Sequence, residues 1–175
     1  MIRFLSFLLF LLCCHSPMGM AQGKKDMKDY WIDKYLSVSF PLENIRINST
    51  FGSRVDPFTG KHKQHKGLDL RARYEEVLSM FDGYVKGVGY DRGSGKYITM
   101  QYGDYTVSYC HLSEIWVSDN QKVYAGDPIG ISGTTGRSTG PHLHITCRLR
   151  GSLEDPYDLL LYIKETKEKI GRAHV

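Results

Sequence analysis

The sequence predicts a mainly β, antiparallel, barrel-like domain followed by one C-terminal helix. Short segments rich in β-branched and aromatic residues alternate with glycine-rich turns, and few segments have the period of an amphipathic helix. The clearest strand pair, residues 97–102 and 105–109, is joined by Gly103-Asp104, a two-residue turn typical of a β-hairpin. Near the C-terminus, Asp155-Pro156 provides an N-cap and a first-turn proline, which predict a helix.

Residues 1–21 are predicted to be a secretory signal peptide. An apolar run follows Arg3, and small residues near its end favour cleavage after Ala21. A retained lipoprotein signal at Cys13 or Cys14 is the alternative, although no small residue precedes Cys13. The apolar run is too short for a membrane span. We therefore expect export to the periplasm or the cell exterior, with no stable membrane span after cleavage.

The rest of the chain is expected to divide into three parts. Residues 22–46 form a lead-in segment, in which Trp31 and Tyr35 could line a short helix. Residues 47–152 form the β domain, and residues 153–175 form the C-terminal helix and tail. We interpret the lead-in and the terminal helix as packed segments without a chemical role.

The formal net charge of +4 bears on which partners the protein is expected to bind. The positive excess is small and scattered, so it does not indicate binding to nucleic acid. It is compatible with an anionic polymer of the cell envelope. We expect the protein to be a monomer.

The elements of the β domain are expected in short succession. Residues 49–60 are predicted to form a loop with a turn at Asp56-Pro57, followed by an exposed stretch at 61–66. The glycines are explained by turns, and they include no P-loop or dinucleotide-binding fingerprint. Strands are predicted at 45–47, 65–70, 77–80, 83–90, 97–102, 105–111 and 142–147, with mixed turn and strand at 115–123 and 124–131.

A loop of small residues at 132–140 leads into the most informative segment, which contains His142 and His144. The preceding Gly140 and Pro141 oppose a helix and favour a strand. Alternate side chains of a strand face opposite ways, so the two imidazoles should project together. They could share one metal ion, or one could bind it while the other acts beside it. A pair of exposed surface histidines is the alternative.

Two further segments offer partners for this pair. His65 and Asp69 fall on one face of an unkinked strand, and Gly67 between them allows a close approach. Histidine with carboxylate is a common pair of zinc ligands, although an ion pair on a surface strand is the alternative. His111 continues the alternation of the strand that contains Tyr109, so it should face the same way as Tyr109. It is a site candidate only if that face also carries His142 and His144.

The cysteines beyond the signal, Cys110 and Cys147, are predicted to face away from this site. Each is separated by an odd number of residues from a candidate, Cys110 from His111 and Cys147 from His144. Their spacing does not match a zinc ribbon. We interpret them as buried thiols, while a disulfide stays open because an exported protein permits one.

The candidate set is therefore His65, Asp69, His111, His142 and His144. A structural zinc site is closed by four protein ligands, whereas a hydrolytic site uses three and leaves a position for water. Two histidines and one aspartate would suffice, and a bound metal lowers the pKa of its water to about 7. The two remaining histidines could then carry protons or stabilise an oxyanion. Alternation alone leaves open which histidine of the 142/144 pair is the ligand.

The chain resembles the LytM/lysostaphin-type zinc metallopeptidases, which cut peptide bonds in bacterial peptidoglycan. The resemblance implies the duplicated hybrid-motif β-fold of that family, Zn²⁺ bound by His65, Asp69 and His144, and catalytic roles for His111 and His142. It also implies that the partners are the peptide stems and cross-links of peptidoglycan. It covers roughly residues 47–151 and rests on Phe51-Gly52-Ser53-Arg54, His65-Lys66-Gly67-Leu68-Asp69, Tyr109-Cys110-His111-Leu112-Ser113 and Gly136-Arg137-Ser138-Thr139-Gly140-Pro141-His142-Leu143-His144.

The expected function is that of an exported zinc endopeptidase that hydrolyses peptidoglycan cross-links. The alternative is an inactive module of the same fold that binds or activates another wall hydrolase. All five candidate residues are present, which favours the enzyme. A structural zinc domain is a weaker third reading, because the histidines outnumber the ligands it needs. The sequence leaves open whether a D-Ala–diaminopimelate bond or a glycine bridge is cut.

Overall fold

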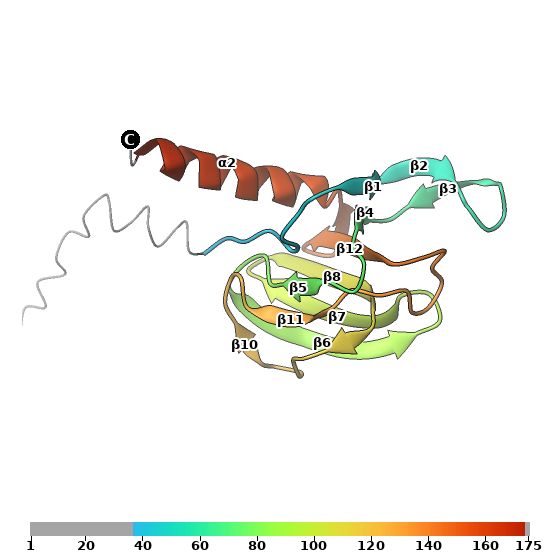
Figure 1. Ribbon diagram of the computed structural model, residues 1–175, viewed down its shortest axis with the longest axis horizontal. Helices are drawn as coiled ribbons and strands as arrows, with labels where there is room; N and C mark the ends of the chain where they lie inside the picture. Colours follow the sequence, from blue (N-terminus) through green and yellow to red (C-terminus); the bar gives the residue numbers. More distant parts are fainter. Residues whose placement is uncertain (1–36, 174–175) are drawn as a thin grey trace, which may run out of the picture.

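The structure is a computed structural model that describes residues 37–173. The predicted signal peptide, the predicted helix near Trp31 and the tail residue His174 lie outside the described residues. The described chain consists of antiparallel β-sheets and one helix, which confirms the predicted fold class (Figure 1). The elements are β1 (Ile47–Ser49), β2 (Gly52–Val55), β3 (His62–His65), β4 (Leu68–Arg71), β5 (Glu76–Leu78), β6 (Gly83–Asp91), β7 (Gly95–Tyr102), β8 (Tyr105–Leu112), β9 (Glu114–Ile115), β10 (Lys122–Val123), β11 (Pro128–Ile131), β12 (His142–Leu149), β13 (Ser152–Glu154) and α2 (Tyr157–Ala173).

The large sheet places the predicted histidine strand in its interior, between β4 and β8. Its strand order is β1-β4-β12-β8-β7-β6-β10, and β13 also pairs with β12. On β12, Leu143 and Ile145 are fully buried in the core, as the alternation predicts, whereas His142 and His144 face the other way. In the register of the sheet, His144 lies opposite Asp69 of β4 and opposite Cys110 of β8. Sheet pairing therefore brings three distant segments to one point.

The small sheet packs on the large one and closes the core. Its order is β5-β11-β9, and Figure 1 shows β5 and β11 lying over β6, β7 and β8. Buried side chains of both sheets form one hydrophobic cluster, with Val77 of β5 and Ile129 of β11 packed among residues of the large sheet. The polar hydroxyl groups inside this core bond to one another, because the Tyr102 hydroxyl contacts Ser79 Oγ at 2.8 Å and the Tyr109 hydroxyl at 2.9 Å.

The segment predicted as a loop at 49–60 instead contains β2, which forms a hairpin with β3. The turn at Asp56-Pro57 is where it was predicted. There the Asp56 carboxylate accepts hydrogen bonds from the backbone N–H groups of Phe58 and Thr59. This is the local bonding that makes aspartate favourable in turns. The loop prediction was wrong because the glycines and the proline of this segment lie at the ends of the hairpin strands.

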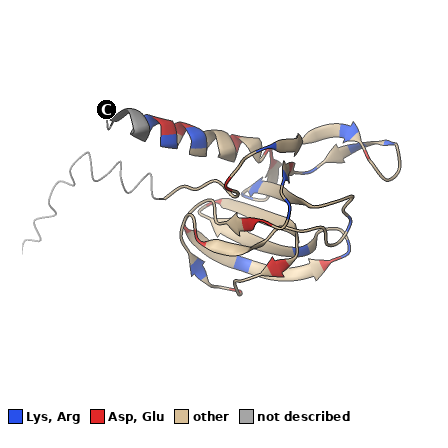
Figure 2. Ribbon diagram, in the orientation of Figure 1, with Lys and Arg blue, Asp and Glu red and all other residues tan. Residues whose placement is uncertain are grey.

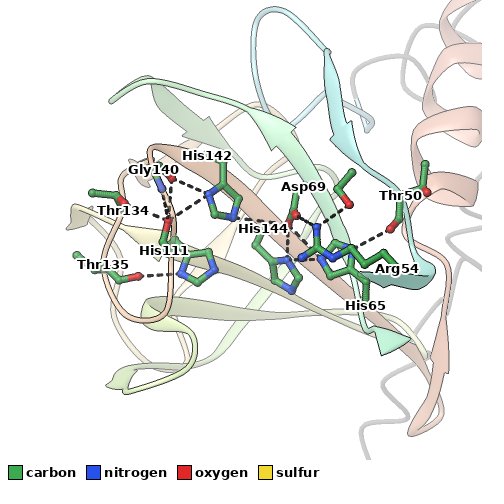
Figure 3. A network of polar contacts seen from close by, with 12 residues as sticks. Thr50, Arg54, His65, Asp69, His111, Thr134, Thr135, Gly140, His142 and His144 are labelled. Atoms are coloured by element: carbon green, nitrogen blue, oxygen red, sulfur yellow. Dashed lines mark hydrogen bonds and ion pairs between the residues drawn. The ribbon is translucent and has the colours of Figure 1, made fainter. Parts of the chain in front are cut away.

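The strand predicted at 65–70 is interrupted. β3 ends at His65 and β4 begins at Leu68, and the two strands belong to different sheets. The short link, Lys66-Gly67, redirects the chain from the hairpin into the large sheet. His65 and Asp69 still converge, because the break lies between them and does not reverse the direction in which either side chain points (Figure 3).

Helix α2 begins where the sequence predicts, because Asp155 Oδ1 accepts a hydrogen bond from the Tyr157 N–H at 2.9 Å. Leu159, Leu160 and Ile163 are buried and join the core cluster. Figure 2 shows charged residues of both signs along the rest of the helix. Across the described part of the chain, no helix is long and apolar enough to cross a membrane.

Candidate functional site

The five candidate residues meet on the face of the large sheet opposite the core (Figure 3). His65 comes from the end of β3, Asp69 from β4, His111 from β8, and His142 and His144 from β12. Asp69 Oδ1 lies 2.6 Å from His144 Nδ1 and 3.2 Å from His65 Nε2. These two ring nitrogens are themselves 3.2 Å apart. The three atoms thus form a compact cluster of possible ligands.

Backbone carbonyl groups fix the orientation of three of the four imidazole rings. His65 Nδ1 lies 2.7 Å from the Thr50 oxygen, and His111 Nδ1 lies 2.8 Å from the Thr135 oxygen. His142 Nδ1 lies 2.8 Å from the Gly140 oxygen. A carbonyl oxygen can only accept, so Nδ1 carries the hydrogen in each ring and Nε2 keeps a free lone pair. This pattern is typical of metal-binding and catalytic histidines.

Two overlapping groups of residues could hold a metal ion, and both include His144. In the first, His65, Asp69 and His144 supply two imidazoles and one carboxylate; in the second, His111 and His142 join His144. Within each group, the possible ligand atoms lie within 4.8 Å of one another. In a tetrahedral site with bonds of about 2.0 Å, ligand atoms are roughly 3.3 Å apart. The 2.6–3.2 Å separations in the first group are close to this value and need only a small opening.

The first group suits a divalent metal ion better than the second, because it includes a carboxylate. Burial opposes ionisation of the Asp69 carboxyl group, but the contacts of the carboxylate with the rings of His144 and His65 outweigh this effect and hold its pKa well below its usual range. Asp69 is therefore an anion at any physiological pH. A carboxylate with two neutral imidazoles is a common donor set for a catalytic metal, and it partly neutralises the charge of the ion.

His111 is set up to stay neutral beside this cluster. Burial is the main cause that lowers its pKa to about 4, against the opposing effect of its hydrogen bond to Thr135. Its ring centroid lies 4.7 Å from that of His142 and 5.7 Å from that of His144. Because its Nδ1 donates to a carbonyl group, the unprotonated Nε2 is available to accept a proton near neutral pH.

A β-bulge explains how His111 reaches the site, and it corrects the prediction for Cys110. Lys96 pairs with Leu112 and Ile98 pairs with Tyr109, so two residues of β8, Cys110 and His111, stand opposite one residue of β7. His111 also has a φ of 64°, in the left-handed region. The bulge breaks the alternation that the sequence argument assumed. Both Cys110 and His111 consequently line the cavity, whereas Cys110 was predicted to face away.

Both described cysteines are buried free thiols, as interpreted from the sequence. Cys147 lies in the core and faces away from the site, as predicted. The register of β8 and β12 places Cys110 opposite His144 but Cys147 opposite Val107. The two thiols are therefore offset by three positions and lie on opposite faces of the sheet, so a disulfide between them would require the strands to move.

Gly67 allows the link between β3 and β4 to pass directly against the ring of His144. A Cβ atom at this position would lie 2.3 Å from the Ile145 oxygen and 2.7 Å from two atoms of the His144 ring. No side chain fits in that space. A close approach at this glycine was expected from the sequence, and the structure shows that the approaching group is the ring of His144, a ligand candidate.

Residues that the sequence argument did not assign complete the cavity of about 550 Å³ around the cluster. Arg54 Nη1 lies 2.9 Å from Asp69 Oδ2, on the side away from the histidines. At one end, Asp56 accepts hydrogen bonds from Arg137, whose guanidinium group lies 4.4 Å from the centre of the Phe58 ring. Arg54 belongs to the motif Phe51-Gly52-Ser53-Arg54, but no sequence pattern connected it with Asp69. Such pairings depend on tertiary contacts between distant segments.

The model of Peptidase family M23 matches residues 63–156. The peptidoglycan DD-endopeptidase ShyA of Vibrio cholerae is 40% identical over 116 residues, which cover 64% of this chain and 27% of that protein. A protein of Buchnera aphidicola named as an uncharacterized metalloprotease is 36% identical over 146 residues, covering 79% of this chain and 39% of that protein. The chain thus spans well under half the length of these relatives.

Comparison with solved structures gives the same picture of the fold. A zinc containing peptidase from Vibrio cholerae matches with a TM-score of 0.63 and 33% identity, over 68% of this chain and 39% of that chain. The catalytic domain of lysostaphin from Staphylococcus simulans matches with a TM-score of 0.61 and 28% identity, over 69% of this chain and 93% of that chain.

Proposed function

Because this chain belongs to peptidase family M23, we propose that it is a zinc-dependent endopeptidase that hydrolyses the peptide cross-links of bacterial peptidoglycan. The proposal is carried by one observation. Three possible ligand atoms from three chain segments converge within 3.2 Å of one another, and two further histidines stand beside them. Relatives named as peptidoglycan DD-endopeptidases support peptidoglycan as the substrate.

His65, Asp69 and His144 would hold the zinc ion, through Nε2, Oδ1 and Nδ1 respectively. Nitrogen and carboxylate donors suit Zn²⁺ among the common divalent ions. When bound, the ion would supply a Lewis acid and a water of lowered pKa. Three protein ligands leave one position open, which distinguishes a hydrolytic centre from a structural one.

His111 and His142 would perform the proton transfers and stabilise charge. His111 stays neutral and has its Nε2 free, so it can accept the proton of the attacking water. The Gly140 carbonyl oxygen fixes the ring of His142, whose Nε2 lies 3.6 Å from Asp69 Oδ1 and so faces the reacting groups. A protonated His142 could donate a hydrogen bond to the developing oxyanion or to the leaving amine.

Activity on peptidoglycan requires delivery to the cell envelope, and the predicted signal at 1–21 would provide it. We therefore propose that the chain is exported. Retention of all five residues in a single converging arrangement favours an active enzyme over a module that only binds or activates another hydrolase.

Digestion of purified sacculi tests this function. The full chain loaded with zinc should release peptide-linked fragments, identified by mass spectrometry, and a chelator should abolish their release. His111→Ala should release none, while His62→Ala should match the unmodified protein, because His62 is exposed on β3 outside the cavity. Intact cross-links after incubation with the zinc-loaded protein would contradict the proposal.

A further inference from the structure

Lys66 is the cationic side chain of the cavity that has no acidic partner among the described residues. Four cationic side chains line the cavity, and three of them pair with an acidic side chain: Arg54 with Asp69, and both Lys63 and Arg137 with Asp56. Lys66 is exposed, and among the described residues its ammonium group makes no hydrogen bond or ion pair.

The other acid of the cavity is also occupied. Asp91 Oδ1 accepts hydrogen bonds from the backbone N–H groups of Gly93 and Ser94, both at 2.7 Å. The hydrogen bond from the Ser94 N–H is the largest cause that lowers the pKa of Asp91, and burial opposes it with a smaller effect. The acids of the cavity are therefore engaged elsewhere, and the ammonium group of Lys66 keeps no acidic partner among the described residues.

The backbone fixes where this ammonium group can act. Lys66 directly follows His65 and precedes Gly67, which is pressed against the His144 ring and the Ile145 oxygen. Its Cα atom is thus anchored next to two proposed ligands. The side chain itself is a flexible four-carbon stem with a compact charge at its end. Any group that it contacts on a bound peptide must lie close to the bond that is cut.

We propose that Lys66 determines specificity by pairing with a carboxylate on the carbon next to the scissile peptide bond. This inference rests on the proposed function and narrows its substrate class. In a D-Ala–diaminopimelate cross-link, the carbon attached to the amide nitrogen carries a free carboxylate. A glycine bridge carries only hydrogen there. Lys66 therefore favours cross-links of the diaminopimelate type over neutral glycine bridges.

A pair of synthetic cross-linked dimers tests this assignment. The two dimers are identical except that the group next to the scissile bond is a carboxylate in one and a carboxamide in the other. The unmodified protein should cut the carboxylate dimer with a kcat/KM at least about fivefold higher, as expected for one charge-assisted hydrogen bond. Lys66→Ala should bring the two values together, and Lys66→Arg should keep the preference.

Lys86→Gln is the matched control, because Lys86 is an exposed lysine outside the cavity, and it should keep the preference unchanged. Equal kcat/KM values for both dimers with the unmodified protein, or a preference that survives Lys66→Ala, would overturn the role of Lys66. Either result leaves the peptidase function intact.

Binding separates this inference from the proposed function. Equilibrium binding of both dimers is measured with zinc-loaded His111→Ala, alone and combined with Lys66→Ala. Tighter binding of the carboxylate dimer that disappears with Lys66→Ala supports the pairing even if the unmodified protein cuts neither dimer, in which case only the peptidase proposal fails. Equal binding of the two dimers contradicts the pairing.

Discussion

The guanidinium group of Arg54 holds one oxygen of Asp69 while the histidines face the other. Arg54 Nη1 lies 2.9 Å from Asp69 Oδ2 and 2.6 Å from Ser49 Oγ. Asp69 Oδ1 is the atom that contacts His65 and His144. The contact ties the β2–β3 hairpin to the large sheet and fixes the plane of the carboxylate. If Asp69 is a metal ligand as proposed, a side chain that orients it in this way tunes the affinity of the site.

Replacing Arg54 by glutamine should weaken zinc binding by roughly tenfold, because the carboxylate loses its charged orienting partner. Competition with a chromophoric chelator measures this affinity. Arg150→Gln is the control, since it removes another arginine–aspartate pair, the exposed contact with Asp104 at 2.8 Å. It should leave the affinity unchanged. An unaltered dissociation constant in Arg54→Gln would show that Asp69 needs no such support.

Gly67→Ala should lower both zinc content and activity, because its Cβ atom would displace the His144 ring or the Ile145 backbone. Gly87→Ala provides the comparison, as a Cβ atom at Gly87 meets nothing within 4 Å. Zinc content and turnover of the two folded variants, checked by circular dichroism, make the measurement. Full zinc content in Gly67→Ala would mean that the link can move aside without affecting the ligands.

The thiols of Cys110 and Cys147 should react slowly in the native protein. Burial is the main cause that raises the pKa of Cys110 to about 12 and that of Cys147 to about 11. Both are therefore protonated and inaccessible at pH 8. Alkylation followed by peptide mapping should find both unmodified until denaturant is added. Rapid native labelling of either residue, or recovery of a peptide in which they are joined, would contradict this arrangement.

The raised pKa of Cys147 predicts that the folded protein loses stability at alkaline pH. A thiol in the unfolded chain has a pKa of about 8.5, so the unfolded state releases its proton first as the pH rises. The folded state keeps the proton of Cys147 until about pH 11. Stability linked to this group is thus complete below about pH 8.5 and declines between there and pH 11. Between pH 8 and 10.5, the midpoint temperature of thermal unfolding should fall less steeply in Cys147→Ala than in the unmodified protein. Parallel curves for the two proteins would refute the linkage.

Much of the fold followed from local signals in the sequence. The hairpin at Gly103-Asp104, the alternation on β12 and the cap at Asp155 depend on neighbouring residues, and the structure confirms all three. β2 was missed because its residues carry turn signals at both ends. The short β13 was also missed, since it forms by pairing with Leu149 and its neighbours rather than from its own composition.

The site was predictable as a set of residues but not in its geometry. Residue types and motifs selected the five candidates, and sheet register brought them together. The bulge that turns His111 toward the cavity could not be predicted, because it depends on an extra residue of β8 opposite β7. The contacts of Arg54 and the carbonyl groups that orient the rings likewise join segments far apart in the chain.

Zinc stoichiometry of three single variants tests the proposed centre most directly. Measured by mass spectrometry on folded protein, His65→Ala should contain almost no zinc, while His111→Ala and the exposed control His62→Ala should each retain one ion per chain. His111→Ala should nevertheless be inactive. Loss of zinc in His111→Ala together with retention in His65→Ala would place the ion among His111, His142 and His144 instead, and would contradict the assignment of ligands and catalytic histidines made here.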